Sequence, residues 1–381
     1  MALQRPTGKR APGLLNIAQP PNHKEEMNNV WLDCDPGHDD AIAILLAIHL
    51  RNINLLGVST VHGNADAKNS AANAARCLYA FAAAHVVRVH PGASKPLLRP
   101  VRHDSEIHGA DGLGGVEGLP TVADAGVHAR LLPDADHLTA IEALARAVRQ
   151  SWQGGRGQKV AVVACGPLTN VALFLSVYPE LLEGVEQIVF MGGGIGVGNR
   201  SAAAEFNILC DPEAAQVVLD ANVPKTMIPL NVTHQAIVTK AIHARLLRGT
   251  STDADGAAPT KASTNLRHTL STLITFFKDA YETTFRFKDG PPIHDALTVA
   301  YVSDPTLFTG KRYRVDVELH GTHTAGETVA DVWGYRACDG SWGATGKNCF
   351  VALELDVPKF MDLFLDCVAE CDKVSPLNHQ A

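Results

Sequence analysis

Four aspartates gather in a short segment near the start of the 381-residue chain, at Asp33, Asp35, Asp39 and Asp40. Carboxylates this close would repel one another in a dry cleft. The cluster is tolerable only if a cation lies among them or some of them take up protons. Carboxylate oxygens suit the hard cations calcium and magnesium, so the segment predicts a hard-cation site. It is not an EF-hand, because the twelfth position counted from Asp33 is Ile44 rather than glutamate.

Apolar runs on either side of the aspartates predict the elements that hold them. The run ahead predicts a strand over residues 30–35, and the run behind predicts a helix over residues 41–50. The aspartates then lie where open α/β sheets bind ligands, at the carboxyl end of a strand. The alternative to a ligand site is that the aspartates cap the helix, but capping explains only Asp39 and Asp40. We expect Asp35 and Asp40 to serve a metal or catalysis, and Asp33 either to do so or to lie behind the ligands.

A histidine and an aspartate stand together at His294-Asp295, after two prolines and before a helix predicted over residues 296–302. The structural alternative is an aspartate N-cap with an incidental histidine. The functional interpretation is a further carboxylate for the cation and an imidazole that can move a proton near neutral pH.

Glycines at 192–194 follow a predicted strand and indicate a close approach of the backbone to a ligand. They do not form a dinucleotide fingerprint, because the sixth position from Gly192 is Val197. Three residues downstream carry groups that hydrogen-bond sugar hydroxyls: Asn199, Glu205 and Asn207. Singly, each is more often a capped loop residue. Together they favour a polyol site.

Shorter polar segments follow two other predicted strands, at residues 61–64 and 164–170. A glycine-rich stretch at residues 107–115 could form a mobile lid. We expect the remaining histidines and the tryptophans to lie in the core or at the surface.

Strand-like and helical patterns alternate along the chain. Strands are predicted at 30–35, 54–60, 159–164, 187–191, 225–229 and 350–355, and helices at 41–50, 68–84, 140–150, 296–302 and 358–373. This order predicts an α/β fold with a mostly parallel central sheet flanked by helices on both faces, an open Rossmann-like arrangement. We expect a flexible tail over residues 1–28 and one domain over residues 29–381. Surface loops are predicted near 251–260 and 334–347.

The composition excludes several partners. A net charge of −7 and a pI near 6.2 give no electrostatic footprint for nucleic acid. No apolar run is long enough to span a membrane, and the polar N-terminus is not a secretory signal. The eight cysteines are scattered without a CxxC pair, which makes zinc a poor candidate and indicates a reducing, cytoplasmic location.

These segments together resemble the inosine/uridine-preferring nucleoside hydrolase family. The family signature is Asp33-x-Asp35-Pro36-Gly37-x-Asp39-Asp40. The other segments follow in the family's order: Gly63-Asn64, Gly166-Pro167-Leu168-Thr169-Asn170, Met191-Gly192-Gly193-Gly194, Glu205-Phe206-Asn207 and His294-Asp295. The resemblance covers nearly everything from Asn28 to the final helix. It implies the nucleoside hydrolase fold and an N-ribohydrolase that splits ribonucleosides into free base and ribose.

The resemblance also implies a set of site residues around one Ca²⁺ per subunit. The metal ligands would be Asp35, Asp40, Asp295 and the main-chain carbonyl of Cys165. Several members have Thr or Val at the last position, which a carbonyl ligand tolerates. The ribose hydroxyls would be held by Asp39, Asn64, the main chain of Met191, Asn199, Glu205 and Asn207. On the base side we expect His108 in the glycine-rich stretch, and Phe277 and Tyr281 on a helix before His294.

The chemistry fits these residue types. Breaking the N-glycosidic bond builds positive charge on the ribose and negative charge on the departing base. An anionic floor would stabilise the oxocarbenium ion, while Ca²⁺ orients a water and lowers its pKa. Asp35 would take the water's proton as general base. His294 would protonate the leaving base, a transfer that typically contributes ~10²–10⁴-fold. Within the family, His294 favours the subgroup that accepts both purine and pyrimidine nucleosides. The family resemblance implies a preference for uridine and inosine, and an unusual ribonucleoside such as nicotinamide riboside stays open.

Two other classes of function stay open at this point. A Mg²⁺-dependent phosphatase would need a cation near the site to meet phosphate, and the motif segments supply only Arg200. A non-catalytic nucleoside or ribose sensor would need no general acid, so His294 would be dispensable. The resemblance further implies a role in nucleoside salvage and a homo-oligomer, either a dimer or a tetramer.

Overall fold

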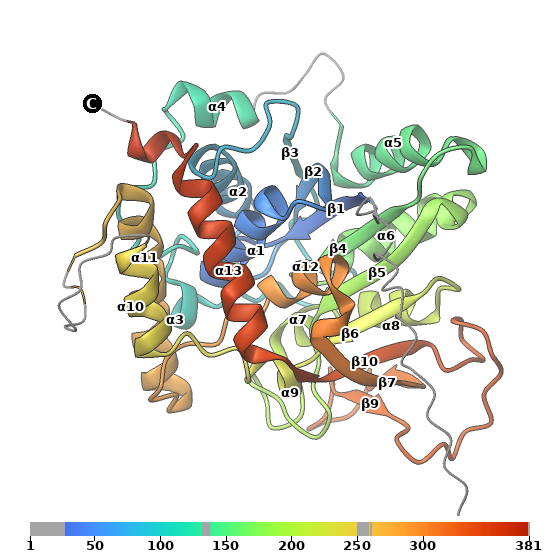
Figure 1. Ribbon diagram of the computed structural model, residues 1–381. Helices are drawn as coiled ribbons and strands as arrows, with labels where there is room; N and C mark the ends of the chain where they lie inside the picture. The colour runs from blue at the N-terminus through green and yellow to red at the C-terminus, as the bar shows by residue number, and fades with distance from the viewer. Residues whose placement is uncertain (1–26, 132–137, 250–258, 260, 380–381) are drawn as a thin grey trace, which may run out of the picture.

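The computed structural model describes residues 27–131, 138–249, 259 and 261–379. In these ranges one sheet of eight strands runs through the molecule in the order β3-β2-β1-β4-β5-β6-β10-β7 (Figure 1). The strands are β1 (Asn28–Cys34), β2 (Ile53–Thr60), β3 (Val89–Pro91), β4 (Val160–Ala164), β5 (Val185–Met191), β6 (Lys225–Ile228), β7 (Phe308–Tyr313) and β10 (Cys349–Leu355). All neighbours are parallel except β7, which pairs antiparallel with β10 at one edge. A separate antiparallel pair is formed by β8 (Val315–Val317) and β9 (Thr328–Ala330).

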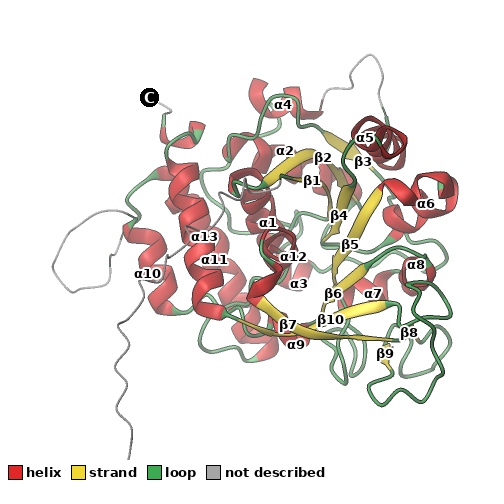
Figure 2. Ribbon diagram, turned by 45° about the vertical axis from the view of Figure 1, so that its right-hand side comes forward, coloured by secondary structure: helices red, strands yellow, loops and turns green. Residues whose placement is uncertain are grey.

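Helices cover both faces of the sheet (Figure 2). One face carries α1 (His38–His49), α2 (Ala67–Ala80), α12 (Ala296–Ser303) and α13 (Val357–Asp372), with α4 (Ala125–Leu131), α10 (Lys240–Arg248) and α11 (Asn265–Phe285) packed beside them. The other face carries α5 (Ala140–Trp152), α6 (Thr169–Val177) and α8 (Pro212–Asp220). Short helices occupy loops: α3 (Ser105–His108), α7 (Phe206–Cys210) and α9 (Leu230–Thr233). The predicted fold class is therefore confirmed.

Side-chain alternation along the strands builds two apolar cores. In β1, Val30 and Leu32 enter the core with α1 and α12, whereas Trp31 enters the core with α5 and α6. β4 is buried along its whole length, as parallel strands covered on both faces are. The rigid sheet between these cores fixes the positions of the loops that leave its carboxyl edge.

The sheet has a topological switch point next to β1. The chain goes from β1 to β2 on one side and later returns as β4 on the other side of β1. Crevices outside the carboxyl ends of strands at such a point are ligand sites in open α/β sheets. The residues that end or follow β1, β2, β4 and β5 lie at this crevice, and they include most of the predicted site residues.

Some element boundaries differ from the sequence prediction. β1 begins at Asn28, so the last residue of the predicted tail belongs to the sheet. α1 begins at His38, three residues earlier than predicted, because the Asp40 carboxylate accepts the main-chain N–H of Gly37 and closes the first turn. The edge strands β3 and β7 and the small β8–β9 sheet were not predicted.

The two predicted surface loops have different outcomes. The loop near 251–260 lies outside the described residues except at position 259. Residues 334–347 contain no helix or strand. Three cationic side chains hold this excursion by donating to its main-chain carbonyls: Lys225, Arg312 and Arg314.

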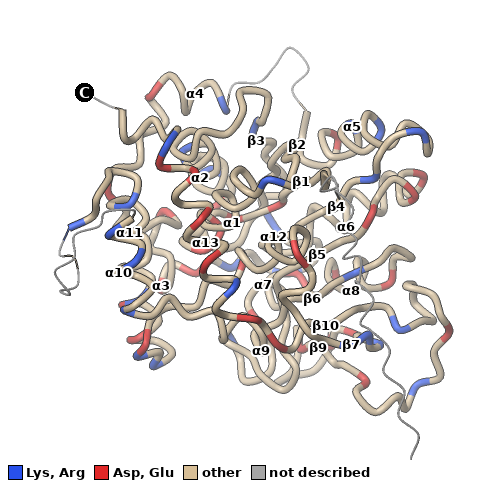
Figure 3. The backbone as a smooth tube through the Cα atoms, viewed as in Figure 1, with Lys and Arg blue, Asp and Glu red and all other residues tan. Residues whose placement is uncertain are grey.

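The charged residues are mixed over the molecule. Lys and Arg lie dispersed among Asp and Glu in the described part of the chain (Figure 3). Within the same ranges, no helix combines the length and apolar character that a membrane crossing requires.

Candidate active site

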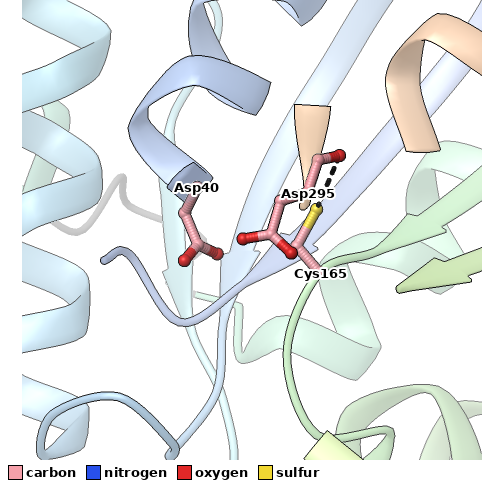
Figure 4. Close-up of side chains that lie close together, drawn as sticks. All are labelled: Asp40, Cys165 and Asp295. Atoms are coloured by element: carbon pink, nitrogen blue, oxygen red, sulfur yellow. Dashed lines mark hydrogen bonds between the residues drawn. The ribbon is translucent and has the colours of Figure 1, made fainter. Parts of the chain in front are cut away.

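Four carboxylates converge beneath the carboxyl ends of β1 and β4. Asp35 follows β1, Asp39 and Asp40 lie in the first turn of α1, and Asp295 immediately precedes α12. All are buried, with relative exposures between 0% and 5%. Figure 4 shows the carboxylates of Asp40 and Asp295 pointing toward each other, with Cys165 beside them. The two helix starts and the strand end therefore bring together residues 260 positions apart in the sequence.

Asn64 ties two of these carboxylates in place. Its main-chain N–H donates to Oδ2 of Asp35 at 2.7 Å, and its side-chain amide donates to Oδ2 of Asp40 at 3.1 Å. Asp40 also accepts the main-chain N–H of Gly37 at 2.9 Å. In contrast, Oδ1 of Asp35 is buried without a hydrogen-bond partner among the described residues. A buried carboxylate oxygen in this state is suited to a cation.

Close packing around Asp35 explains two motif glycines. A Cβ atom at Gly63 or at Gly166 would collide with the carboxylate of Asp35. Glycine is therefore required where the segments after β2 and β4 pass this side chain.

Burial dominates the electrostatics of the four carboxylates. It raises the pKa of Asp39 to about 8 and the pKa values of Asp35 and Asp295 well above the usual range, and the neighbouring aspartates raise them further. The carboxylate oxygens of Asp40 and Asp295 belong to a buried group whose possible ligand atoms all lie within 4.8 Å of one another. Such a group is stabilised by protons or by a cation. The donor set therefore fits a hard metal ion.

Asp295 does not act as a helix cap. It stands at the N-cap position of α12, but its side chain accepts no main-chain N–H there. The capping alternative weighed for the His294-Asp295 pair therefore has no support from the contacts of this carboxylate.

The Sγ atom of Cys165 lies in the same group of possible ligand atoms as the carboxylates of Asp40 and Asp295. Burial raises the pKa of its thiol well above the usual range, and Sγ lies 3.5 Å from Oγ1 of Thr298 and 4.0 Å from the main-chain O of Asp295. A protonated thiol is a poor metal ligand. The main-chain O of Cys165 accepts the side-chain amide of Asn207 at 2.8 Å, which turns it toward the polar wall of the site.

A small cavity with a free volume of about 40 Å³ lies above the carboxylates. Two of the predicted site residues, Asp35 and Asp40, do not line this cavity. All the others do: Asp39, Asn64, His108, Cys165, Met191, Asn199, Glu205, Asn207, Phe277, Tyr281, His294 and Asp295. Four further lining residues were not predicted: Asp104, Ile107, Phe206 and Phe285. Phe206 lies within the motif Glu205-Phe206-Asn207 and Ile107 in the glycine-rich stretch, whereas no motif surrounds Asp104 or Phe285.

One wall of the cavity is polar and rigidly held. Glu205 accepts main-chain N–H groups from Gly193 at 2.9 Å and from Asn207 at 3.0 Å, and burial raises its pKa to about 7. The side-chain amide of Asn207 donates to the main-chain O of Met191 at 3.2 Å. Asn199 accepts the main-chain N–H of Phe206 at 2.9 Å. The glycine turn after β5 and the start of α7 are thus fixed to each other.

The opposite wall is aromatic. α11 places Phe277 and Tyr281 one turn apart on the same side, with ring centroids 4.7 Å apart. The hydroxyl of Tyr281 lies 2.7 Å from Nε2 of His294, and Oγ1 of Thr233 lies 2.7 Å from Nδ1. Burial, with a smaller effect of His234, lowers the pKa of His294 well below its usual value. Burial therefore favours the neutral form of this imidazole.

An ion pair between Arg200 and Asp104 lies beside the cavity, which Asp104 lines. Arg200 makes a two-pronged contact with Asp104 and a further hydrogen bond to Glu106 at 3.2 Å. Its guanidinium lies over the ring of Phe285, 5.4 Å from the centroid. The loop that carries Asn199 is thus joined to the start of α3.

Asp33 and His38 lie close to the site but do not line its cavity. Asp33 lies behind the site, where it accepts hydrogen bonds from Ser59 and from Asn170 at 2.7 Å. His38 was expected in the core or at the surface, and its ring packs against His108 and Phe277 at the cavity wall. His38 is 2% exposed and therefore lies in the core, as expected; the sequence did not show that its neighbours there would include rings of the cavity wall.

Comparisons with known proteins agree with this geometry. The family model described as inosine-uridine preferring nucleoside hydrolase matches residues 30–362. The chain belongs to this family. Membership confirms the enzyme class expected from the sequence, a ribonucleoside N-ribohydrolase.

Individual members support the assignment along almost the whole chain. A probable ribonucleoside hydrolase of Dictyostelium discoideum is 39% identical, over 91% of this chain and 96% of that protein. The pyrimidine-specific ribonucleoside hydrolase RihA of Shewanella woodyi is 38% identical, over 88% of this chain and 96% of that protein. Among solved structures, a purine-preferring ribonucleoside hydrolase from Gardnerella vaginalis has a TM-score of 0.75 at 28% identity, covering 91% of this chain and 100% of that one.

Proposed function

We propose that this family member is a Ca²⁺-dependent enzyme that hydrolyses the N-glycosidic bond of ribonucleosides to free base and ribose. The observation that carries the proposal is the group of four buried carboxylates, including an oxygen of Asp35 without a partner among the described residues. All the donors are oxygens, which Ca²⁺ prefers. Asp35, Asp40, Asp295 and the main-chain O of Cys165 would hold the ion.

The carboxylates have two tasks in the reaction. A bound Ca²⁺ would supply an oriented water of lowered pKa. Asp35 takes a proton from the attacking water as general base. The same anionic floor stabilises the positive charge that develops on the ribose as the bond to the base breaks. The polar wall of Asn64, Glu205 and Asn207 holds the sugar hydroxyls so that this charge develops directly above the floor.

The leaving base takes its proton from the aromatic wall. His294 is the general acid, and Tyr281 is its hydrogen-bonded partner at the cavity surface. Each hydroxyl beside the imidazole can donate or accept, so the ring keeps both partners whichever nitrogen carries its proton. The acid is the imidazolium form, which takes its second proton from solvent, gives one proton to the leaving base and returns to the neutral ring, while Thr233 accepts the N–H of the other nitrogen.

We propose that uridine and inosine are the preferred substrates. A pyrimidine-specific relative and a purine-preferring structural neighbour together support a fold that accepts either class. His108, Phe277 and Tyr281 would contact the base. The flat faces of these rings can stack on any planar base, which favours acceptance of several bases over selection of one.

The two rival functions fit the contacts less well. A phosphatase needs a cation free to meet phosphate, but Arg200 is engaged by Asp104 and Glu106. A sensor has no use for a buried imidazole with a hydroxyl partner on each nitrogen, since neither group would need to move a proton.

The cellular setting is part of the proposal. Eight free cysteines, seven of them buried, favour the reducing cytoplasm. We infer a role in nucleoside salvage, one domain over residues 29–381, a homo-oligomer of two or four subunits, and no nucleic-acid or membrane partner.

Metal removal tests the proposal. Protein stripped with a chelator should release no ribose from uridine, and addition of Ca²⁺ should restore release. Mg²⁺ should restore less, because it demands a smaller octahedral site and sheds its water reluctantly. Full activity in the chelator would contradict the proposal.

A further inference from the structure

His38, the first residue of α1, lies directly behind the base side of the cavity. Its side chain is 2% exposed. Its ring stacks on Phe276 and Phe277, with centroids 5.0 and 5.4 Å away and nearly parallel planes. Phe277 belongs to the cavity wall, but His38 does not line the cavity. No step of the reaction proposed above uses this buried imidazole.

The tautomer of His38 is set by the glycine-rich stretch. Its Nε2 lies 2.9 Å from the main-chain O of Gly114. A carbonyl oxygen only accepts, so Nε2 must carry a hydrogen. In the neutral ring, Nδ1 of His38 is then an acceptor and cannot donate.

His108 meets two groups of His38 at a single nitrogen. Its Nδ1 lies 3.3 Å from Nδ1 of His38, which accepts, and 3.4 Å from the main-chain N–H of His38, which donates. This N–H is one of the free donors at the start of a helix. His108 therefore finds a partner whether or not its own Nδ1 carries the proton.

His108 lines the cavity. Whether its ring presents a lone pair or an N–H there depends on whether its Nδ1 donates or accepts. A neutral imidazole carries one hydrogen, so Nε2 presents a lone pair when Nδ1 donates and an N–H when Nδ1 accepts. We propose that His38 is a positioning residue for base specificity, which lets His108 offer the base either a hydrogen-bond acceptor or a donor. This inference rests on the proposed function, because it concerns recognition of the base of a nucleoside.

Such a pair would widen the range of substrates. Uracil and cytosine carry opposite donors and acceptors at ring position 3 and at the exocyclic position 4, and hypoxanthine and adenine differ in the same way. A histidine fixed in one tautomer would pair with one kind of base and leave a buried polar group unpaired against the other. A histidine that can change tautomer without losing its own partner serves both.

The substitution His38→Phe tests this idea. Phenylalanine keeps the stack on Phe276 and Phe277 and leaves the main-chain N–H, but it removes the acceptor that Nδ1 of His38 provides. Nδ1 of His108 can then only accept, so Nε2 can only donate. We expect the ratio of kcat/KM for uridine to kcat/KM for cytidine to change by about tenfold, the equivalent of one buried hydrogen bond.

Two controls separate this effect from damage to the fold. 4-Nitrophenyl riboside has no base edge to read, so its kcat/KM should stay close to that of the wild type in His38→Phe. Phe276→Leu removes a stacking partner of His38 but neither hydrogen bond, so the uridine-to-cytidine ratio should not change. Equal losses on uridine and cytidine in His38→Phe, or no loss on either, would overturn the proposal.

A measurement on the wild type does not depend on the variant folding. In ¹⁵N-histidine-labelled protein, long-range ¹H–¹⁵N spectra should show the two nitrogens of His108 averaged between both tautomers. A single fixed tautomer would overturn the proposal. If the wild type with Ca²⁺ releases no ribose from any nucleoside, the proposed function itself fails, which is a separate result.

Discussion

The hydroxyl of Tyr281 lies 2.7 Å from Nε2 of His294, and this contact joins the aromatic wall to the carboxylate floor, since Asp295 is the next residue. α11 delivers the phenol and the segment before α12 delivers the imidazole. One short contact therefore sets the position of the proposed acid relative to the proposed metal site.

Loss of the acid should slow turnover more than binding. His294→Gln keeps a polar side chain of similar reach but cannot transfer a proton, so kcat on uridine should fall by about 10²–10⁴-fold with a small change in KM. Steady-state kinetics on uridine and on 4-nitrophenyl riboside provide the check, because nitrophenolate leaves without protonation. An equal loss on both substrates would show that His294 is not the acid.

Removal of the phenol hydroxyl should have a smaller effect of the same kind. Tyr281→Phe keeps the ring packed on Phe277 but leaves Nε2 of His294 without its partner. We expect kcat on uridine to fall by about tenfold, the value of one hydrogen bond in the transition state. A rise in KM with unchanged kcat would instead assign Tyr281 to substrate binding alone.

The general base should be essential. Asp35→Asn keeps the shape of the side chain but removes its ability to take a proton, so turnover should fall below detection on every nucleoside. The matched control is Asp66→Asn, because Asp66 is an exposed N-cap of α2 and asparagine caps helices equally well. Substantial activity of Asp35→Asn would remove this residue from its proposed role.

The stabilisation that Ca²⁺ provides should grow with pH. Burial raises the pKa of Asp39 to about 8, above its ordinary value, and raises those of Asp35 and Asp295 as well. The folded metal-free chain then holds protons that the unfolded chain releases, so it loses stability as pH rises from about 4 toward 8. Ca²⁺ replaces these protons and removes the loss.

Thermal unfolding with chelator and with Ca²⁺, from pH 5 to pH 8, measures this effect. The quantity to compare is the difference in Tm at each pH, because buried neutral histidines act in the opposite direction below pH 7 in both samples. A difference in Tm that is zero, or that shrinks as pH rises, would contradict the carboxylate assignment.

The ion pair between Arg200 and Asp104 should control substrate affinity. Arg200→Gln removes the link between Asp104 and the loop that carries Asn199. We expect KM for uridine to rise by about tenfold while kcat changes little, because the link orders a binding loop and touches no reacting atom. Arg149→Gln is the control, since it breaks an exposed ion pair with Glu180 away from the cavity. A loss confined to kcat would contradict this role.

The sequence predicted the floor and the polar wall because their residues follow strands. Asp35 and Cys165 come directly after β1 and β4, Met191 is the last residue of β5, and parallel strands bring their carboxyl ends to one edge. Periodicity located these strands to within two residues, so the convergence of the motifs could be inferred before the fold was known.

The ion pair of Arg200 with Asp104 and the position of His38 behind the aromatic wall could not be predicted in this way. Asp104 and Arg200 belong to irregular loops, whose path depends on tertiary contacts rather than on local periodicity. The short edge strand β7 was missed because its exposed middle residues, Thr309 to Lys311, do not read as a buried strand. His38 was overlooked because the contacts that give it a role come from residues 70 or more positions away.

The most direct test of the central claim is ribose release by the purified, Ca²⁺-loaded protein. Uridine, inosine, cytidine and adenosine should be compared with their 5′-monophosphates under the same conditions. We predict release from the nucleosides, fastest from uridine and inosine, and little from the monophosphates. No release from any nucleoside, with the metal shown to be bound, would contradict the account.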